Sequence, residues 1–291
     1  MAFNDMFVLR REIQRSLLGR VYLVWRVDSD GDDGYRATKI SKVIPGLEKA
    51  GIYESVVTER EVLTKLRDEY PHRNLLCLSP EDEQFVTPEL YYITMPFASN
   101  GDLFTYFKTH QFSFANALVY STQIMLGLRH LHEKVGYAHN DMSLENVLVF
   151  DDVVKISDYG LSMALGEPWP ADRKKGGKMP YQAPEIYTGT QKRCARAADV
   201  FSLGCIVFML VYQSPPFERP DPIDARFEAI QRGTLAGVLD GWGALEAAPA
   251  SFAKLMERML HANPEERVSL DSVMQDEIFK PIVHRYDPDR Q

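Results

Sequence analysis

Over the first ~95 residues, short apolar runs separated by polar ones predict mostly strands, with one helix among them. Residues 21–25 and 35–40 are typical of paired strands, and the acidic, glycine-bearing stretch 28–34 between them is typical of a turn. We expect another strand over 91–95 and a helix over about 54–69.

The pattern changes after Asn100 and Gly101, where the chain becomes mainly helical. Apolar positions then recur in steps of three and four, which predicts a helix with one buried face along Ala117, Ser121, Ile124, Leu128, Leu131 and Val135. Residues 200–212 are apolar on nearly all sides, which predicts a helix buried in this second part of the chain. A strand-rich part is therefore followed by a larger helical part.

Composition limits the class of protein. The chain has 291 residues, 45% of them hydrophobic, so it can bury a large core in one or two domains. Its net charge of −8 argues against binding to nucleic acid. Cysteines stand at only three positions, with no metal-like spacing, which fits a reducing compartment. No apolar run reaches 18 residues and the N-terminus has no signal pattern, so we expect a cytoplasmic protein without membrane insertion. The sequence carries no signal for an oligomeric state.

A polar loop and the hairpin after it bring candidate metal ligands together. Asp141 and Asn146 are five residues apart on the predicted loop. Strands predicted over 147–150 and 153–156 then fold back on each other, which places Asp158 beside Asn146. Carboxylate and amide oxygens are the hard ligands that magnesium prefers.

These motifs resemble the catalytic core of the eukaryotic protein kinase superfamily. The resemblance rests on the ordered segments 139–146 (HNDMSLEN), 158–160 (DYG) and 183–185 (APE), and it covers roughly residues 6–280. It implies an α+β, bilobal, protein-kinase-like fold with a small β-rich N-lobe and a larger helical C-lobe. The kinase domain would span 1–280, with the N-lobe over about 1–96, a connector over 96–101, the C-lobe over 101–280, and a short C-terminal tail over 281–291.

The resemblance also assigns catalytic roles. Asp141 would accept or orient the proton of the attacking hydroxyl, while Asn146 and Asp158 would hold Mg²⁺ at the phosphates of ATP. Lys39 matches the family's strand lysine. Glu59 lies in register with the apolar positions of the predicted helix, where an ion pair to Lys39 would compensate its burial. Glu61 is the alternative partner, although it points away from that stripe.

The nucleotide site is implied in the same way. Met95 matches the gatekeeper, Pro96 and Ala98 match the connector positions that bind adenine through backbone groups, and Asp102 matches a ribose ligand. The adenine ring would lie between Val21, Ala37 and Leu148, and Gly19 matches the third glycine of a glycine-rich loop.

Scaffold motifs indicate the class of substrate. Glu185 and Arg267 match a buried ion pair, and Asp199 matches the acid that binds the catalytic-loop backbone. These features are typical of protein kinases rather than small-molecule phosphotransferases, so the expected partners are ATP and protein substrates. Glu145, directly before Asn146, favours serine/threonine specificity over tyrosine.

Several positions depart from the family pattern. Gln14 and Ser16 stand where the first two loop glycines are expected, which predicts weaker ATP binding. Asn140 replaces the arginine that pairs with a phosphorylated activation loop. The only hydroxyls between Asp158 and Glu185 belong to Tyr159, Ser162 and Tyr181, so we expect activity that does not depend on phosphorylation there.

Two lysine-related changes lie in the same region. Ser143 replaces the lysine that contacts the transferred phosphate, and Lys178 replaces a threonine. Lys178 either supplies charge near the site or is simply solvated, and we favour the solvated interpretation from the sequence. The basic run 173–175 either attracts an acidic substrate or is a solvated loop.

Two functions follow from these observations. In the first, which we favour, the protein is an ATP- and magnesium-dependent protein kinase that transfers the γ-phosphoryl group to protein hydroxyls. We expect these hydroxyls to belong to serine and threonine. In the alternative, it is a pseudokinase, a kinase-shaped scaffold or interaction module with weak or no catalysis, as the changes at Gln14, Ser16, Asn140 and Ser143 suggest.

Overall fold

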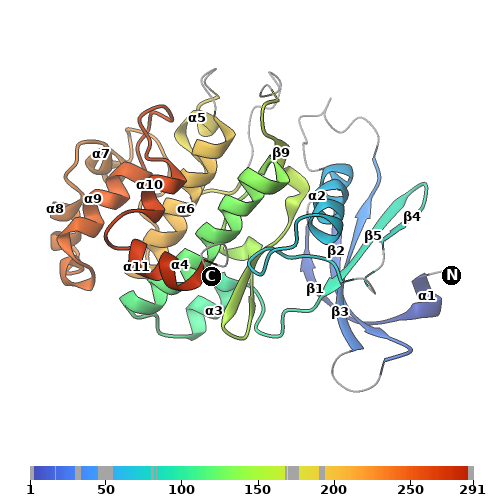
Figure 1. Cartoon of the computed structure of the whole chain (residues 1–291). Helices are drawn as coiled ribbons and strands as arrows, with labels where there is room; N and C mark the ends of the chain where they lie inside the picture. Colours follow the sequence, from blue (N-terminus) through green and yellow to red (C-terminus); the bar gives the residue numbers. More distant parts are fainter. Residues whose placement is uncertain are drawn as a thin grey trace.

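One antiparallel sheet forms the N-terminal lobe (Figure 1). The computed structural model describes residues 3–16, 18–29, 34–44, 55–79, 82, 84–167, 169, 177–189 and 194–287. The sheet has the order β1-β2-β3-β5-β4, with strands β1 (Phe7–Arg15), β2 (Gly19–Arg26), β3 (Tyr35–Lys42), β5 (Leu90–Pro96) and β4 (Gln84–Val86). The three predicted strands are confirmed as parts of β2, β3 and β5. The predicted turn over 28–34 lies partly outside the described residues.

Strand β1 was not predicted, because its apolar residues do not alternate with polar ones. Of its nine residues only Phe7 is buried, and charged side chains occupy much of the rest. The strand is held by its backbone pairing with β2, from Phe7 opposite Arg26 to Arg15 opposite Arg20. It is therefore an exposed edge strand, in which periodicity is weak.

Helix α2 (Val56–Asp68) lies beside this sheet (Figure 1). Ser55 caps it by accepting a hydrogen bond from the backbone N–H of Thr58. The buried face consists of Glu59, Val62, Leu63 and Leu66. The prediction of a helix here is confirmed, although residue 54, the expected start, lies outside the described residues.

The C-terminal lobe is mainly helical and is built around α4 (Phe114–His130) and α6 (Ala195–Tyr212), which pack against each other. The predicted apolar stripe is confirmed, since all six of its members are buried along α4 and the π-helical turn Leu131–Val135 that continues it. Further helices surround this pair: α3 (Leu103–Thr109), α5 (Pro184–Tyr187), α7 (Ala225–Gln231), α8 (Leu235–Gly241), α9 (Ala250–Met259), α10 (Leu270–Met274) and α11 (Lys280–Tyr286). The fold is bilobal α+β, as the sequence predicts.

The C-lobe also contains two short two-stranded sheets. Strands β7 (Val147–Phe150) and β8 (Val153–Ile156) form the predicted hairpin, and β6 (Tyr137–Ala138) pairs with β9 (Met163–Ala164). Both pairs flank the loop 139–146, so this loop is fixed at the boundary between the lobes.

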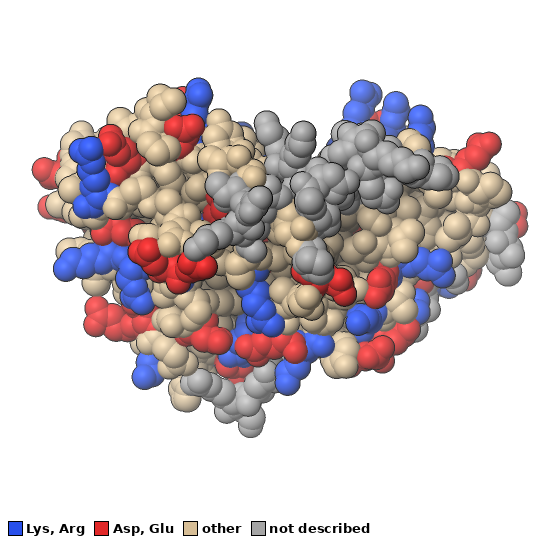
Figure 2. Space-filling view, turned by 90° about the horizontal axis from the view of Figure 1, so that it is seen from above, with Lys and Arg blue, Asp and Glu red and all other residues tan. Residues whose placement is uncertain are grey.

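Helix α6 has the length and hydropathy of a membrane-spanning helix, yet 72% of it is buried inside the protein. Its apolar character is accounted for by its place at the centre of the C-lobe. On the face seen in Figure 2, acidic and basic side chains are interspersed over the described residues. The cytoplasmic location stays a prediction.

The C-terminal segment differs from the short tail predicted over 281–291. Helix α11 extends the C-lobe through Tyr286 and buries Val283 against it. Asp287 is also buried and accepts a hydrogen bond at 2.9 Å from Arg129 of α4. Residues up to 287 are thus part of the C-lobe, because apolar side chains of α11 pack into its core and Asp287 pairs with Arg129 of α4.

Candidate active site

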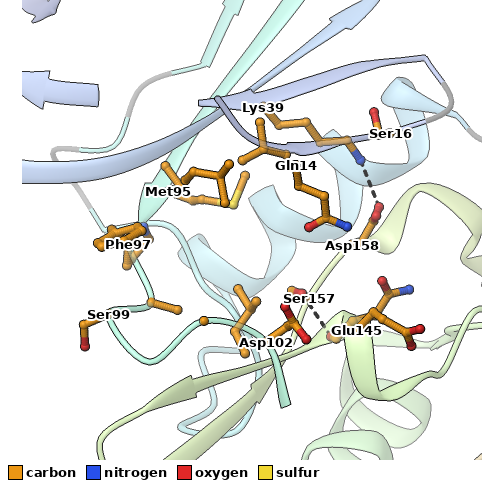
Figure 3. Close-up of a pocket in the computed structure, with 18 of the residues that line it drawn as sticks. Gln14, Ser16, Lys39, Met95, Phe97, Ser99, Asp102, Glu145, Ser157 and Asp158 are labelled. Atoms are coloured by element: carbon orange, nitrogen blue, oxygen red, sulfur yellow. Dashed lines mark hydrogen bonds and ion pairs between the residues drawn. The ribbon is translucent and has the colours of Figure 1, made fainter. Parts of the chain in front are cut away.

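A cavity of about 220 Å³ lies between the two lobes (Figure 3). Of the predicted nucleotide-site residues, Val21, Ala37, Lys39, Met95, Pro96, Ala98, Asp102 and Leu148 line it. So do side chains that the sequence did not single out for it, among them Arg11, Ile13, Phe97, Ser99 and Ser157. These belong to the exposed edge strand, to the connector and, for Ser157, to the residue directly after β8, where apolar periodicity gives no signal for a binding role.

Gly19 does not line this cavity. A Cβ atom on Gly19 would lie 1.9 Å from the carbonyl oxygen of Ile40, so a glycine is needed there for β2 to approach β3. Gln14 and Ser16 do line the cavity, and Figure 3 shows the Gln14 side chain pointing into it. Side chains therefore occupy part of the space where a glycine-rich loop would present only backbone.

An ion-pair network connects the two lobes. The Nζ of Lys39, on β3, lies 2.9 Å from Glu59 Oε2 and 2.9 Å from Asp158 Oδ1. Lys39 and Glu59 are each 3% exposed. The predicted Lys39–Glu59 pair is confirmed, and Glu61 is not the partner in this network. The contact with Asp158 was not foreseen; it joins the N-lobe to the segment after β8.

Asp158 follows β8 in a left-handed backbone conformation, with φ of 63°. Burial tends to raise the pKa of its carboxyl group, but the neighbouring Lys39 ammonium outweighs this and holds the pKa below its ordinary value. Asp158 is thus a carboxylate at neutral pH. The backbone N–H of Ser157 donates to Asn146 O at 2.8 Å, which places Asp158 beside Asn146 as the predicted hairpin requires.

The catalytic loop is held by Asp199 of α6. This carboxylate accepts from the backbone N–H groups of His139 at 2.7 Å and Asn140 at 2.8 Å, and it contacts His132 Nε2 at 2.8 Å. Asp199 is fully buried. The predicted bond from this acid to the loop backbone is confirmed.

Asp141 lies at the centre of the loop. Its Oδ2 and its backbone carbonyl accept hydrogen bonds from the Asn146 side-chain amide at 2.8 and 2.7 Å. Its Oδ1 is buried and has no hydrogen-bond partner within the described part of the protein. Burial raises the pKa of this carboxyl group, while the positive charge of Lys178 opposes that shift. A buried carboxylate oxygen with a free acceptor site is suited to taking a proton.

Lys178 corrects the solvated interpretation that we favoured from the sequence. It is only half-buried rather than exposed, and its Nζ donates to Asn146 Oδ1 at 3.1 Å and to Ser143 Oγ at 3.4 Å. The lysine therefore contacts the catalytic loop directly. The basic run 173–175 lies outside the described residues.

Magnesium fits the donors at this place. Asn146 Oδ1 and the ionised carboxylate of Asp158 are hard oxygen ligands that border the same cavity as Lys39. Asn146 uses its Nδ2 group for Asp141, and its amide oxygen, which accepts from Lys178 in this structure, is the atom that would turn to the cation. The two side chains thus provide ligand chemistry suited to a hard divalent cation.

Two scaffold features support the segment that faces the site. Arg267 forms a bidentate ion pair with Glu185 of α5, with both N···O distances at 2.8 Å. Tyr159, directly after Asp158, is fully buried and donates from its hydroxyl to Ile156 O at 2.8 Å. The predicted Glu185–Arg267 pair is confirmed, and the Tyr159 hydroxyl has a partner.

Comparisons with known proteins agree with this geometry. The family described as "Protein kinase domain" matches residues 18–279. The chain is 30% identical over 230 residues to the serine/threonine-protein kinase PLK4 of Drosophila willistoni, which covers 77% of this chain and 27% of that protein. It is 28% identical over 273 residues to an Aurora kinase of Schizosaccharomyces pombe, covering 92% and 70%. It is 32% identical over 207 residues to an SNF-related serine/threonine-protein kinase of Rattus norvegicus, covering 69% and 26%.

The chain spans about a quarter of the length of two of these relatives, so their similarity concerns one region of each. The family match covers most of the chain and includes the connector, the catalytic loop and the Glu185–Arg267 pair. On this match and on the bilobal fold, the chain belongs to the protein kinase domain family.

Proposed function

We propose that this protein is a catalytically competent kinase that transfers the γ-phosphoryl group of ATP to serine and threonine hydroxyls of protein substrates. The observation that carries the proposal is the network Glu59–Lys39–Asp158. It requires α2, β3 and the segment after β8 to be in place together. Phosphoryl transfer needs positioning and charge from the protein rather than covalent chemistry, and this network supplies both.

Each residue then has a defined task. Val21, Ala37 and Leu148 enclose the adenine ring, and Lys39 Nζ reaches the phosphates. The acceptor hydroxyl attacks the γ-phosphorus, the bond to the β-phosphate oxygen breaks, and ADP leaves. The proton of the hydroxyl passes to Asp141, whose Oδ1 has no hydrogen-bond partner within the described residues.

Asn146 and Asp158 would hold the magnesium that this reaction class uses, and a bound magnesium neutralises charge on the phosphates. The carboxylate state of Asp158, favoured by Lys39, suits it to that task. Both residues are held relative to one another by the Ser157–Asn146 backbone bond.

We also infer that activity does not depend on phosphorylation of the activation segment. Its hydroxyl side chains, Tyr159, Ser162 and Tyr181, are all buried, at 0, 7 and 3% exposure. A buried hydroxyl is inaccessible to another kinase. Asn140 offers no positive charge to a phosphate group. The Glu185–Arg267 and Asp199 contacts position the segment and loop without it.

Serine/threonine specificity rests on Glu145 and on the similarity to two serine/threonine-protein kinases, PLK4 and the SNF-related kinase.

The test is transfer of the γ-phosphoryl group from Mg²⁺–ATP to a generic acceptor protein, with phosphoamino-acid analysis of the product. We expect transfer by the wild type and a loss of at least ~10²-fold in Asp141→Asn, which cannot accept the proton. The enzyme is first treated with a phosphatase that is then removed, and activity should persist. Loss of activity after this treatment would contradict phosphorylation independence.

The alternative, a pseudokinase, is favoured by one observation: Gln14 and Ser16 place side chains in the nucleotide cavity. Thermal unfolding with ATP, with and without Mg²⁺, distinguishes the two functions. Absence of any shift, together with no transfer to several acceptors, would leave the interaction-module function.

A further inference from the structure

We propose that Lys178, which comes from the activation segment rather than from the catalytic loop, is the cation that contacts the transferred phosphoryl group in the transition state. The inference rests on the proposed function and assigns a residue to it. In this protein the positive charge beside Asp141 would therefore depend on the docking of the activation segment.

The ammonium group of Lys178 has unused hydrogen-bonding capacity. Its ammonium group has three N–H donors, and its two partners, Asn146 Oδ1 and Ser143 Oγ, are both neutral. Within the described residues it has no carboxylate partner at ion-pair distance. A half-buried ammonium group that has an unused donor and no carboxylate partner can bind an anionic ligand such as a phosphoryl group.

The distribution of charge in the site favours the same residue. Lys39 is already paired with two carboxylates, Glu59 and Asp158. Lys178 instead contacts Asn146 and lines a small pocket together with Asp141, which the acceptor hydroxyl must approach to lose its proton. Negative charge on the transferred group spreads over its three equatorial oxygens, and a cation on the acceptor side stabilises it there.

The backbone around Lys178 is shaped to bring the residue close to the catalytic loop. Gly177 has φ of 81°, and a Cβ atom at that residue would lie 3.3 Å from Asn140 O and 3.6 Å from Asp141 Oδ1. A side chain there would push the segment away from the loop. Ser143 is fully buried and small, so it leaves space for the lysine side chain and offers its hydroxyl as a partner.

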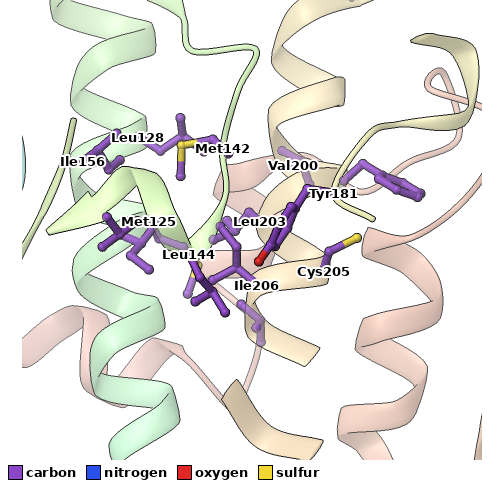
Figure 4. Packing of buried hydrophobic residues seen from close by; sticks show 14 of the residues in the cluster. Met125, Leu128, Met142, Leu144, Ile156, Tyr181, Val200, Leu203, Cys205 and Ile206 are labelled. Carbon is purple, nitrogen blue, oxygen red and sulfur yellow. The ribbon is translucent and has the colours of Figure 1, made fainter. Parts of the chain in front are cut away.

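The segment is also anchored directly after Lys178. The backbone N–H of Tyr181 donates to Lys178 O at 2.8 Å, and Ser202 Oγ of α6 donates to Tyr181 O at 2.8 Å. Figure 4 shows the Tyr181 ring lying among Leu144, Leu203 and Ile206. The anchoring of Tyr181 in the core of the C-lobe therefore fixes the position of Lys178, as a group that acts by positioning requires.

The test exchanges the two positions. We expect Lys178→Thr to lower kcat by about 10²-fold, with little change in KM for ATP, because the contact is made in the transition state. Adding Ser143→Lys to this variant should restore most of the lost kcat, since it returns an ammonium group to the same place. Lys134→Met, at an exposed lysine, is the matched control and should leave kcat unchanged.

A second readout does not depend on turnover. Thermal unfolding is measured with Mg²⁺–ADP and an acceptor peptide, with and without fluoroaluminate, which mimics the transferred group. Lys178→Thr should keep the shift caused by ADP, which also shows that it is folded, and lose the additional shift caused by fluoroaluminate. The double variant should regain that additional shift.

The inference is overturned if Lys178→Thr keeps kcat within about twofold of the wild type, a change too small for a transition-state charge contact. It is also overturned if kcat falls while the fluoroaluminate shift remains, or if the double variant regains neither. Absence of transfer by the wild type would instead overturn the proposed function, and this inference with it.

Discussion

The buried ion pair between Glu185 and Arg267 gives the sharpest test of how the C-lobe is held together. Both N···O distances are 2.8 Å, and the side chains are 0 and 2% exposed for Arg267 and Glu185. Glu185→Gln keeps the shape of the side chain but leaves the guanidinium buried without its counter-charge. Breaking a buried pair in this way costs about 3–5 kcal/mol. We expect the lower end, near ~3 kcal/mol, because Arg267 keeps its bonds to His261 O and Ala197 O.

The matched control is Glu228→Gln, which breaks a pair of the same chemistry on the surface. Arg232 and Glu228 lie 2.6 Å apart, but their side chains are 69 and 42% exposed. This change should lower the free energy of unfolding by at most about 0.5 kcal/mol, and in 1 M salt Glu228→Gln should be as stable as the wild type. The free energy of unfolding is measured by urea titration for both variants. Equal costs, or a loss below about 1 kcal/mol for Glu185→Gln, would refute the reasoning that burial makes this pair indispensable.

Three further predictions concern the nucleotide cavity, the activation segment and a helix cap. Replacing Gln14 and Ser16 together by glycine should lower KM for ATP by about tenfold, since backbone N–H groups then approach the phosphates. Arg15→Gly, between these positions, is the control for added flexibility. An equal fall in KM in the double variant and in Arg15→Gly would contradict this explanation. Gly177→Ala should lower kcat severalfold in steady-state assays, because its Cβ atom would press on Asn140 O. The control is Gly166→Ala, which has φ of 94° and no atom within 4 Å of the added Cβ, and which should only reduce stability. Asp224 caps α7, and burial tends to raise the pKa of its carboxyl group, but its hydrogen bonds from backbone N–H groups outweigh this and hold the pKa below its ordinary value. The cap therefore stabilises above the unfolded-state pKa of about 4 and is lost as the pH falls through the folded value. Asp224→Asn should cost about 1–2 kcal/mol in urea unfolding at pH 7 and less at about pH 3, and a cost independent of pH would contradict it.

The sequence predicted most of the fold and the contacts whose residues lie on regular elements. Glu59 was found because a carboxylate on the apolar stripe of α2 needs a buried partner, and the β7–β8 hairpin brought Asp158 to Asn146 as its turn required. Strand β1 was missed because nearly all of its side chains face solvent.

The remaining site contacts lie on irregular backbone. Lys178 reaches Asn146 across 32 positions, from a segment whose course is set by Gly177 and Tyr181 rather than by a repeating pattern. Helix α11 was taken for a tail because its attachment depends on the long-range pair of Arg129 with Asp287. Both contacts join parts of the chain that have no local relation, so periodicity carries no information about them.

The hydrogen bond of Tyr159 has a consequence for inhibitor design. A compound that displaces this buried ring must first break the bond to Ile156 O, and it must also expose or re-pair the phenol hydroxyl. A phenylalanine at the same position would carry no such cost. Such compounds should therefore bind about tenfold more weakly to the natural protein than to Tyr159→Phe, while ligands confined to the adenine pocket should bind both equally. Selective inhibitors of this protein are better sought among compounds that leave the Tyr159 ring in place.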